Sequence, residues 1–302
     1  MSRLLALACW IFVFSVVAVS GAPSVTDVKV VPVPGGTYKM GNLVGDSDLT
    51  DAVTVNVTLS TYYMAVNVTT KALWDAVRTW AVSSGYTDLA AGAGKAANHP
   101  VQTVTWYNAV KWANAASEKE GLTPCYKVNG AVYRTGTSDA VTCDWSANGY
   151  RLPTEAEWEV AARGGLSGKR FPWGDTISQS QANYWASTSY AYDLSGSVSD
   201  FHPTYKTGKY LYTSPVGSFA ANGYGLYDMA GNVFQWCWDW YDGMPYAGGT
   251  DPRGAGTGSL RVLRGGGWNG GAINARSADR FKNPPGLACN CYGFRLARGR
   301  LF

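Results

Sequence analysis

Three stretches of the chain repeat apolar residues at the spacing of a helix that buries one face. They predict helices over 71–82, over 107–120, and after Thr154, where Thr154 and Glu157 have capping-box spacing and Gly164 stops the helix. The inward faces consist of Leu73, Trp74, Val77 and Trp80, then Ala109, Val110, Ala113 and Ala116, then Trp158, Ala161 and Ala162. These are few helices for the length of the chain.

The strand signals are short and widely separated. They predict strands over 28–33, 53–59, 130–133 and 261–264. Ser/Gly-rich stretches at 186–198 and 247–258 are interleaved with tyrosine and tryptophan, so they predict long ordered loops and no linker. The pattern therefore indicates an irregular, loop-rich α+β fold with a few short strands and about three helices. We expect one domain over 21–302.

The N-terminus has the pattern of an export signal. Arg3 precedes an apolar run over 4–19, and the small residues Ala18 and Ser20 offer a cleavage point before Gly21. We predict a signal peptide over 1–20 and an exported protein that is periplasmic, secreted or at the cell surface. A retained anchor helix is the alternative. Cys9 stands in a lipoprotein-like box but ahead of most of the apolar run, so lipid anchoring there needs a different start or unusual processing.

Composition narrows the class of protein. The 302 residues carry a net charge of +4 and only 15% charged residues, whereas aromatic residues make up 14% and glycines number 36. Disorder, a coiled coil and nucleic-acid binding fit this balance poorly. We expect a monomer with no nucleic-acid partner, and the only membrane attachment expected is a lipid anchor.

The cysteines suggest a single bridge. Cys125 and Cys143 flank a hairpin with the turn signal Asn129-Gly130, and we predict a disulfide between them. Cys289 and Cys291 are too close in sequence for an easy bridge to each other. No CxxC pair or nearby histidine supports a zinc site.

Six segments occur together in an order that points to a known family. They are Pro34-Gly35-Gly36-Thr37-Tyr38-Lys39-Met40-Gly41, Arg151-Leu152-Pro153-Thr154-Glu155-Ala156-Glu157-Trp158-Glu159, Phe171-Pro172-Trp173-Gly174-Asp175, Asn222-Gly223-Tyr224-Gly225-Leu226-Tyr227-Asp228-Met229-Ala230-Gly231-Asn232-Val233, Arg264-Gly265-Gly266-Gly267-Trp268 and Gly293-Phe294-Arg295. This series resembles the formylglycine-generating enzyme, or sulfatase-modifying factor, family over about 28–298. The resemblance implies a C-type-lectin-like fold in its formylglycine-generating variant.

The resemblance also implies what the catalytic members need. They oxidise a cysteine of a sulfatase with a copper-binding cysteine pair, placed between the motif at Arg264 and an Ala-Arg-Ser-like segment. Here that interval, 268–277, holds no cysteine, and neither asparagine nor glycine can replace a thiolate. We therefore expect no catalysis, no copper and no required cofactor.

Calcium sites of the family carry over in part. One set comprises Asp228, the Gly231 and Val233 carbonyls, and Gln235 in place of the usual glutamate, a change that removes a charge. A second set comprises Asn183, the Tyr184 carbonyl and Asp193. The alternative is that Asp228 and Asn232 only cap turns in a glycine-rich loop.

The segment over about 268–292 departs from any regular period. It resembles the variable region of the variable proteins of diversity-generating retroelements, which share this fold and of which Treponema has a member. That resemblance implies a ligand-binding face, with Arg276 and Arg280 bracing its loops. The expected face comprises Trp268, Asn269, Gly271, Ile273, Asn274, Asp279, Phe281, Lys282, Leu287, Cys289, Cys291 and Tyr292.

Three functions therefore compete. The leading hypothesis is an exported, non-catalytic protein that binds an unidentified protein or glycan through a diversified face, as a receptor or adhesin does. The second is an enzyme, or enzyme remnant, of the formylglycine-generating family. The third is a fixed carbohydrate-binding module, prompted by the many tryptophans and tyrosines, although most of these stand in scaffold motifs.

Overall fold

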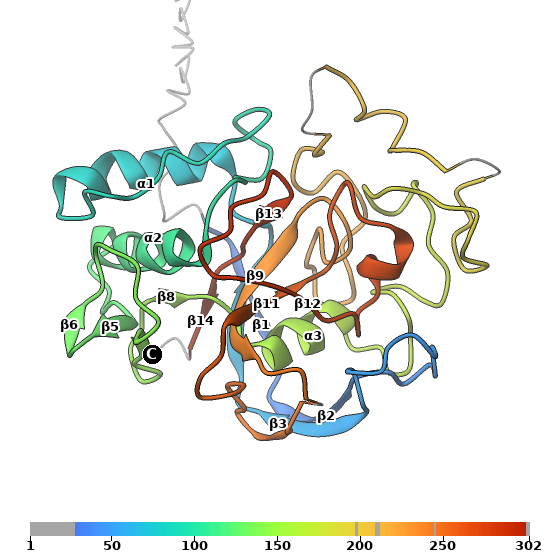
Figure 1. The fold of residues 1–302 in the computed structure, drawn as a ribbon, viewed down its shortest axis with the longest axis horizontal. Coiled ribbons are helices and arrows are strands. Elements are labelled where there is room, and N and C mark those ends of the chain that lie inside the picture. The colour runs from blue at the N-terminus through green and yellow to red at the C-terminus, as the bar shows by residue number, and fades with distance from the viewer. Residues whose placement is uncertain (1–27, 197–198, 209–211, 245, 300–302) are drawn as a thin grey trace, which may run out of the picture.

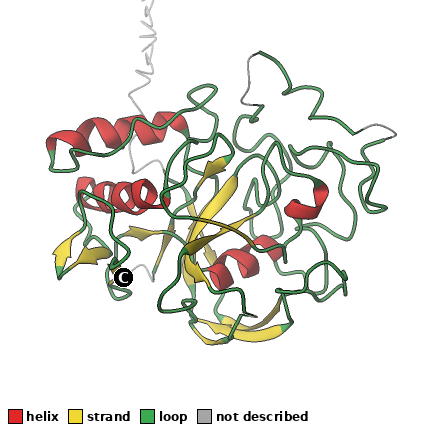
Figure 2. Ribbon diagram, viewed as in Figure 1, coloured by secondary structure: helices red, strands yellow, loops and turns green. Residues whose placement is uncertain are grey.

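The computed structural model describes residues 28–196, 199–208, 212–244 and 246–299. Within these ranges the chain forms three α-helices and many short strands joined by long loops (Figures 1 and 2). The predicted α+β, loop-rich class is confirmed. The predicted signal peptide over 1–20, with Cys9, lies outside the described residues. No helix in the described ranges has the length and apolar character that a membrane span requires.

Two of the helices lie side by side and bury tryptophans between them. They are α1 (Lys71–Ser83), which begins after the N-cap Thr70, and α2 (Trp106–Lys119), which begins after Thr105. The Trp74 and Trp112 rings stack at 5.7 Å, and the edge of Phe294 meets both. Both helices were predicted from their apolar spacing, and their ends differ from the prediction by one residue.

The third helix, α3 (Glu155–Arg163), has the ends that the sequence predicts. The Thr154 hydroxyl accepts a hydrogen bond from the Glu157 backbone N–H, and the Glu157 carboxylate accepts one from the Thr154 N–H. Gly164 ends the helix with φ +56°, a left-handed conformation that favours glycine. The helix is buried along its whole length.

The strands form four small sheets. Their orders are β1-β4-β14-β8, β10-β3-β2, β12-β11-β9-β13 and β6-β5-β7. The first strands in chain order are β1 (Val30–Val33), β2 (Gly36–Met40), β3 (Val55–Leu59) and β4 (Tyr62–Ala65). The middle strands are β5 (Tyr126–Val128), β6 (Ala131–Val132), β7 (Thr142–Cys143) and β8 (Tyr150–Arg151). The last are β9 (Phe234–Tyr241), β10 (Gly249–Thr250), β11 (Leu260–Arg264), β12 (Phe281–Asn283), β13 (Tyr292–Gly293) and β14 (Ala297–Arg298).

The four predicted strands correspond to β1, β3, β6 and β11. The hairpin turn at Asn129 and Gly130 is also confirmed, with both residues at positive φ, +50° and +80°. Strand β9 was not predicted. Because it is buried on both faces, its sequence FQWCWDWY lacks the apolar–polar alternation that marks a half-exposed strand.

A buried ionic network joins α3 to β11. Glu159 accepts hydrogen bonds from the Arg163 guanidinium at 2.7 Å, from Arg264 at 2.5 Å and from the Gly41 backbone N–H at 2.7 Å. All three charged side chains are buried. The network fixes the start of the C-terminal segment, because Arg264 immediately precedes it.

Candidate ligand-binding face

The C-terminal segment is held by the sheet that contains β9. Strand β11 runs antiparallel to both β9 and β12, and β13 runs parallel to β9. Between β11 and β12 the chain forms a short 3-10 helix, η2 (Ala272–Ala275). The buried Arg276 that follows binds Asp46 at 2.8 Å and Asp48 at 2.6 Å. The segment is therefore fixed where η2 ends, whereas residues 284 and 286–288, after β12, are exposed.

Besides Asp279 and Cys289, which are also half-buried and are described below, seven of the expected face residues have surface-accessible side chains or backbone. Asn269 and Leu287 are exposed, and the other five are half-buried: Gly271, Ile273, Asn274, Phe281 and Lys282. Phe281 packs on Phe234, with ring centroids 4.7 Å apart. The Lys282 ammonium lies 3.2 Å from the Tyr241 hydroxyl. These seven residues lie in or near β12 and η2, and we call them the candidate face.

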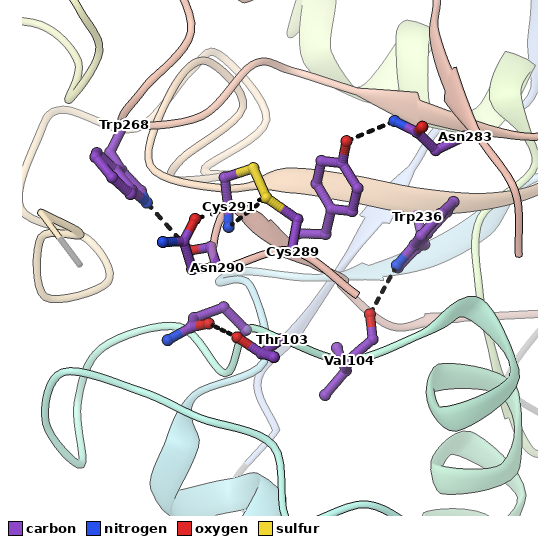
Figure 3. Close-up of a disulfide and its surroundings, with 10 residues drawn as sticks. Thr103, Val104, Trp236, Trp268, Asn283, Cys289, Asn290 and Cys291 are labelled. Carbon is purple, nitrogen blue, oxygen red and sulfur yellow. Dashed lines mark hydrogen bonds between the residues drawn. A yellow bond between two sulfur atoms is a disulfide. The ribbon is translucent and has the colours of Figure 1, made fainter. Parts of the chain in front are cut away.

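Three other expected face residues belong to the core, so the prediction was wrong for them. Trp268, Cys291 and Tyr292 are buried, with exposed fractions of 4%, 4% and 6%. Trp268 packs on Phe201 and Tyr212 and donates its indole N–H to the Asn290 carbonyl at 3.1 Å (Figure 3). The irregular sequence of this segment hid these positions, since no period distinguishes its inward residues from its outward ones.

The cysteine pairing also differs from the prediction. Cys125 and Cys143 are free thiols, and the structure instead joins Cys289 to Cys291 (Figure 3). The chain turns tightly there, with the Tyr292 N–H donating to the Cys289 carbonyl at 3.0 Å. The two Cα atoms consequently lie 5.2 Å apart, within the ordinary range for a disulfide, so sequence proximity did not exclude the bridge. Cys289 is half-buried beside the candidate face.

Asp279 is a mostly buried carboxyl beneath the candidate face. Its side chain is 15% exposed and accepts a hydrogen bond from the Asn274 amide at 3.3 Å. Burial raises the pKa of Asp279 to about 6, and the nearby Arg264 and Arg276 only partly oppose this rise. Asp279 therefore orients Asn274 more than it faces a ligand.

We expect Asp279→Asn to stabilise the protein at neutral pH. Because the folded-state pKa is raised, the unfolded state releases the proton first, and stability is lost as pH rises from about 4 to about 6. An asparagine can still accept from Asn274 but has no proton to lose. Chemical denaturation measures the free energy of unfolding of the variant and of the parent. The difference, variant minus parent, should be about 2–3 kcal/mol larger at about pH 8 than at about pH 4. An equal difference at both pH values would show that Asp279 titrates normally.

Sequence reasoning missed an aromatic residue that borders the candidate face. Trp185 is 40% exposed, and its backbone N–H donates to the Gly270 carbonyl at 2.9 Å. Its ring lies 4.8 Å from that of Phe201, which itself contacts Trp268. No local pattern marked Trp185, because its place beside the face depends on a contact across 85 residues of sequence. The family resemblance predicted a role, as calcium ligands, only for the neighbouring Asn183 and Tyr184.

The first expected calcium set does not fit a cation. The Gln235 side-chain oxygen accepts from the Trp158 indole at 2.9 Å and from the Arg295 guanidinium at 2.7 Å. A guanidinium at that oxygen repels Ca²⁺. The alternative of turn capping is supported instead: Asp228 and Asn232 have φ of +53° and +66°, and Asp228 accepts from the Gly217 N–H and the Asn232 amide.

The second expected calcium set is partly committed to other partners. Asp193 accepts from the Tyr184 hydroxyl at 2.6 Å and from the Ser187 N–H at 2.8 Å. Within this set, the Asn183 side-chain oxygen is the one side-chain atom that is buried without a partner among the described residues. In the described ranges no three His, Cys, Asp or Glu side chains cluster as metal ligands do. Calcium at this set stays a prediction that rests on the Asn183 oxygen.

The chain is similar to several known proteins. Residues 17–300 match the model of the sulfatase-modifying factor enzyme 1-like domain. The chain is 32% identical to the formylglycine-generating enzyme of Streptomyces coelicolor, over 88% of each chain. It is 37% identical, over 67% of its own length, to serine/threonine-protein kinase pkn1 of Chlamydia caviae, but spans only 24% of that protein. Among solved structures, Treponema denticola variable protein 1 is similar with a TM-score of 0.69 and 30% identity, covering 90% of this chain and 95% of that one.

Proposed function

Because the chain belongs to the sulfatase-modifying factor enzyme 1-like family and has its C-type-lectin-like fold, we propose that it is an exported, non-catalytic ligand-binding protein with a diversified candidate face. The same fold serves a variable protein in Treponema denticola. In this proposal the ligand is a protein or a glycan, the protein acts as a monomer, and no cofactor is required.

One observation supports the proposal most strongly. The C-terminal part of the chain combines buried residues that hydrogen bonds hold in place with exposed residues that are not held in this way. Arg264, Arg276 and Arg295 are buried and bound to carboxylates or carbonyls from distant parts of the chain. Asn269 and Leu287, by contrast, are exposed, and the Asn269 amide makes no hydrogen bond to another described residue. A rigid framework that holds unconstrained side chains at the surface lowers the ordering cost of binding. It also permits those side chains to change without loss of the fold.

One of the described thiols favours binding over cysteine oxidation. Cys237 is buried, and burial raises the pKa of its thiol well above its usual value. A buried thiol with a raised pKa is a poor nucleophile and a poor metal ligand. None of the described cysteines stands in 268–277, the interval in which the catalytic members of the family hold theirs.

One observation favours the enzymatic alternative. The Cys289–Cys291 bridge borders the candidate face, so its reduction would place the half-buried Cys289 thiol there, with the buried Cys291 thiol beneath it. Copper-dependent oxidation of a cysteine-containing sulfatase peptide tests this alternative. Turnover that the Cys289→Ser and Cys291→Ser variants abolish would establish it, and turnover no greater than in those variants would remove it.

The carbohydrate-binding alternative gains little from the bulk of the aromatic residues. Trp74, Trp106, Trp112, Trp158 and Trp236 are fully buried, so they stabilise the core and cannot stack on a sugar. Among the tryptophans that the structure describes, Trp185 is the one that is exposed. A glycan array with the parent protein and Trp185→Ala decides the matter, because a fixed module requires saturable binding that the variant loses.

A pair of display libraries tests the proposal itself. The first library randomises Asn269, Gly271, Ile273 and Asn274, and the second randomises Trp268, Cys291 and Tyr292. We expect the first to stay folded and to yield binders to unrelated protein targets, and the second to lose folded display. A first library that unfolds as often as the second, or that folds and yields no saturable binder, would overturn the proposal.

A further inference from the structure

A polar cleft lies outside the candidate face, because none of the residues that line it belongs to 268–292. It has a volume of about 640 Å³ and is bounded by the β3–β4 turn, the loop after β7, the start of α3 and the loop after β10. In Figure 1, β3 lies at the lower edge of the molecule, below β12. The residues that matter in it are Ser60, Thr61, Tyr63, Trp145, Thr154 and Arg253.

The carboxylates of the cleft are already engaged. Glu157 binds the Arg151 guanidinium through both oxygens, at 2.6 and 2.7 Å, and also accepts from the Thr154 N–H. Asp251 accepts from the Ser60 N–H at 2.7 Å and from the Ser60 hydroxyl at 2.8 Å. Both carboxylates that line the cleft therefore already have hydrogen-bond partners within the protein.

The donors of the cleft are not satisfied in the same way. Arg253 is exposed and makes no ion pair or hydrogen bond with another described residue. The Thr61 and Thr154 hydroxyl oxygens accept from the Gly35 and Glu157 backbone N–H groups, which leaves the protons of both hydroxyls free to donate. The Tyr63 hydroxyl also has no partner among the described residues. This balance favours a ligand rich in acceptors.

Arg253 is oriented for such a ligand. Its guanidinium stacks on the Trp145 ring, 4.3 Å from the ring centroid. Stacking occupies the face of the guanidinium and leaves its N–H edge available for a bidentate bond to a carboxylate or phosphoryl group. The half-buried Trp145 is itself held against Trp238 at 5.7 Å, so the platform under Arg253 is anchored in the protein.

We propose that this cleft binds a sugar-sized anion whose carboxylate or phosphoryl oxygens pair with Arg253. The volume exceeds what a lone inorganic ion needs and suits a ligand of one or a few rings. The free hydroxyl protons of Thr61, Tyr63 and Thr154 supply the remaining donors. The site is fixed in the scaffold and lies outside 268–292, so it takes an unchanging ligand whatever the candidate face binds.

Calorimetric titration of the full chain tests this site. The probes are glucuronate, glucose 6-phosphate, inorganic phosphate and, as the neutral control, glucose. We expect saturable binding of at least one of the two sugar anions and none of glucose, and the stronger sugar anion identifies the head group as carboxylate or phosphoryl. Arg253→Ala should weaken that binding at least about tenfold, and Arg253→Lys by less, because lysine keeps the charge and loses the bidentate geometry.

A matched variant separates the site from a general effect of charge. Lys39→Ala removes one exposed positive charge on β2, outside the cleft, and should leave binding unchanged. Thermal melting of each variant confirms that it is folded, as expected for substitutions at exposed positions. The proposal is overturned if no sugar anion binds at millimolar concentration, if inorganic phosphate binds as tightly as the sugar anions, or if Arg253→Ala and Lys39→Ala have equal effects.

Discussion

Replacing Glu159 with glutamine is expected to lower the free energy of unfolding by about 3–5 kcal/mol. Burial alone would raise the pKa of this carboxyl, but the Arg163 and Arg264 guanidinium groups hold the pKa below its usual value. The carboxylate is therefore charged in the folded protein, and it neutralises two buried arginines. Glutamine keeps the size of the side chain and leaves both cations without their shared anion.

Urea denaturation of the variant at neutral pH measures this loss. The matched control is Asp75→Asn, which breaks the exposed ion pair with Lys71 on α1 and should cost less than about 1 kcal/mol. Equal losses in the two variants would show that the buried network adds nothing specific. Because the pKa of Glu159 is lowered, its contribution is present at neutral pH and is lost as pH falls through that folded-state pKa.

Replacing Trp268 with alanine is expected to cost about 3–5 kcal/mol, although the residue stands inside the segment proposed to vary. The indole is 4% exposed, contacts Phe201 and Tyr212, and donates a hydrogen bond to the Asn290 carbonyl. Its loss leaves a cavity against Phe201 and Tyr212 and an unpaired carbonyl at Asn290. Trp185, which packs on Phe201, should become less ordered as well.

The neighbouring residue gives the control for this prediction. Asn269 is exposed and makes no side-chain hydrogen bond to a described residue, so Asn269→Ala should change stability by no more than about 0.5 kcal/mol. Thermal denaturation monitored by tryptophan fluorescence measures both variants. Similar melting temperatures for Trp268→Ala and the parent would mean that Trp268 is a surface residue, as the sequence first predicted.

The helices could be predicted from the sequence because their determinants are local. The capping box at Thr154 and Glu157 and the glycine at 164 specify α3 within ten residues of chain, and the structure forms both ends as predicted. Strand β9 could not be predicted in the same way. Its burial on both faces comes from α2 and α3 together with the neighbouring strands, so no alternation remained in its own sequence.

The candidate face was predicted only in part, for a related reason. The family resemblance located the segment, but inward and outward residues within it are set by contacts with distant chain. Trp268 is buried by Phe201 and Tyr212, and Tyr292 by Phe234 and Trp236. Trp185 borders the face because its backbone N–H donates a hydrogen bond to the Gly270 carbonyl. Only the folded chain shows these neighbours.

The most direct test of the proposed function is deep sequencing of the 3′ end of the gene across a population of source cells. A diversified face predicts that substitutions concentrate at the accessible positions, Asn269, Gly271, Ile273, Asn274, Phe281, Lys282 and Leu287. Codons for Trp268, Arg276, Cys291 and Tyr292, and those over 151–240, should stay constant. A uniform segment, or substitutions spread evenly over buried and accessible positions, would contradict the diversified face and leave a fixed receptor or an enzyme of the family.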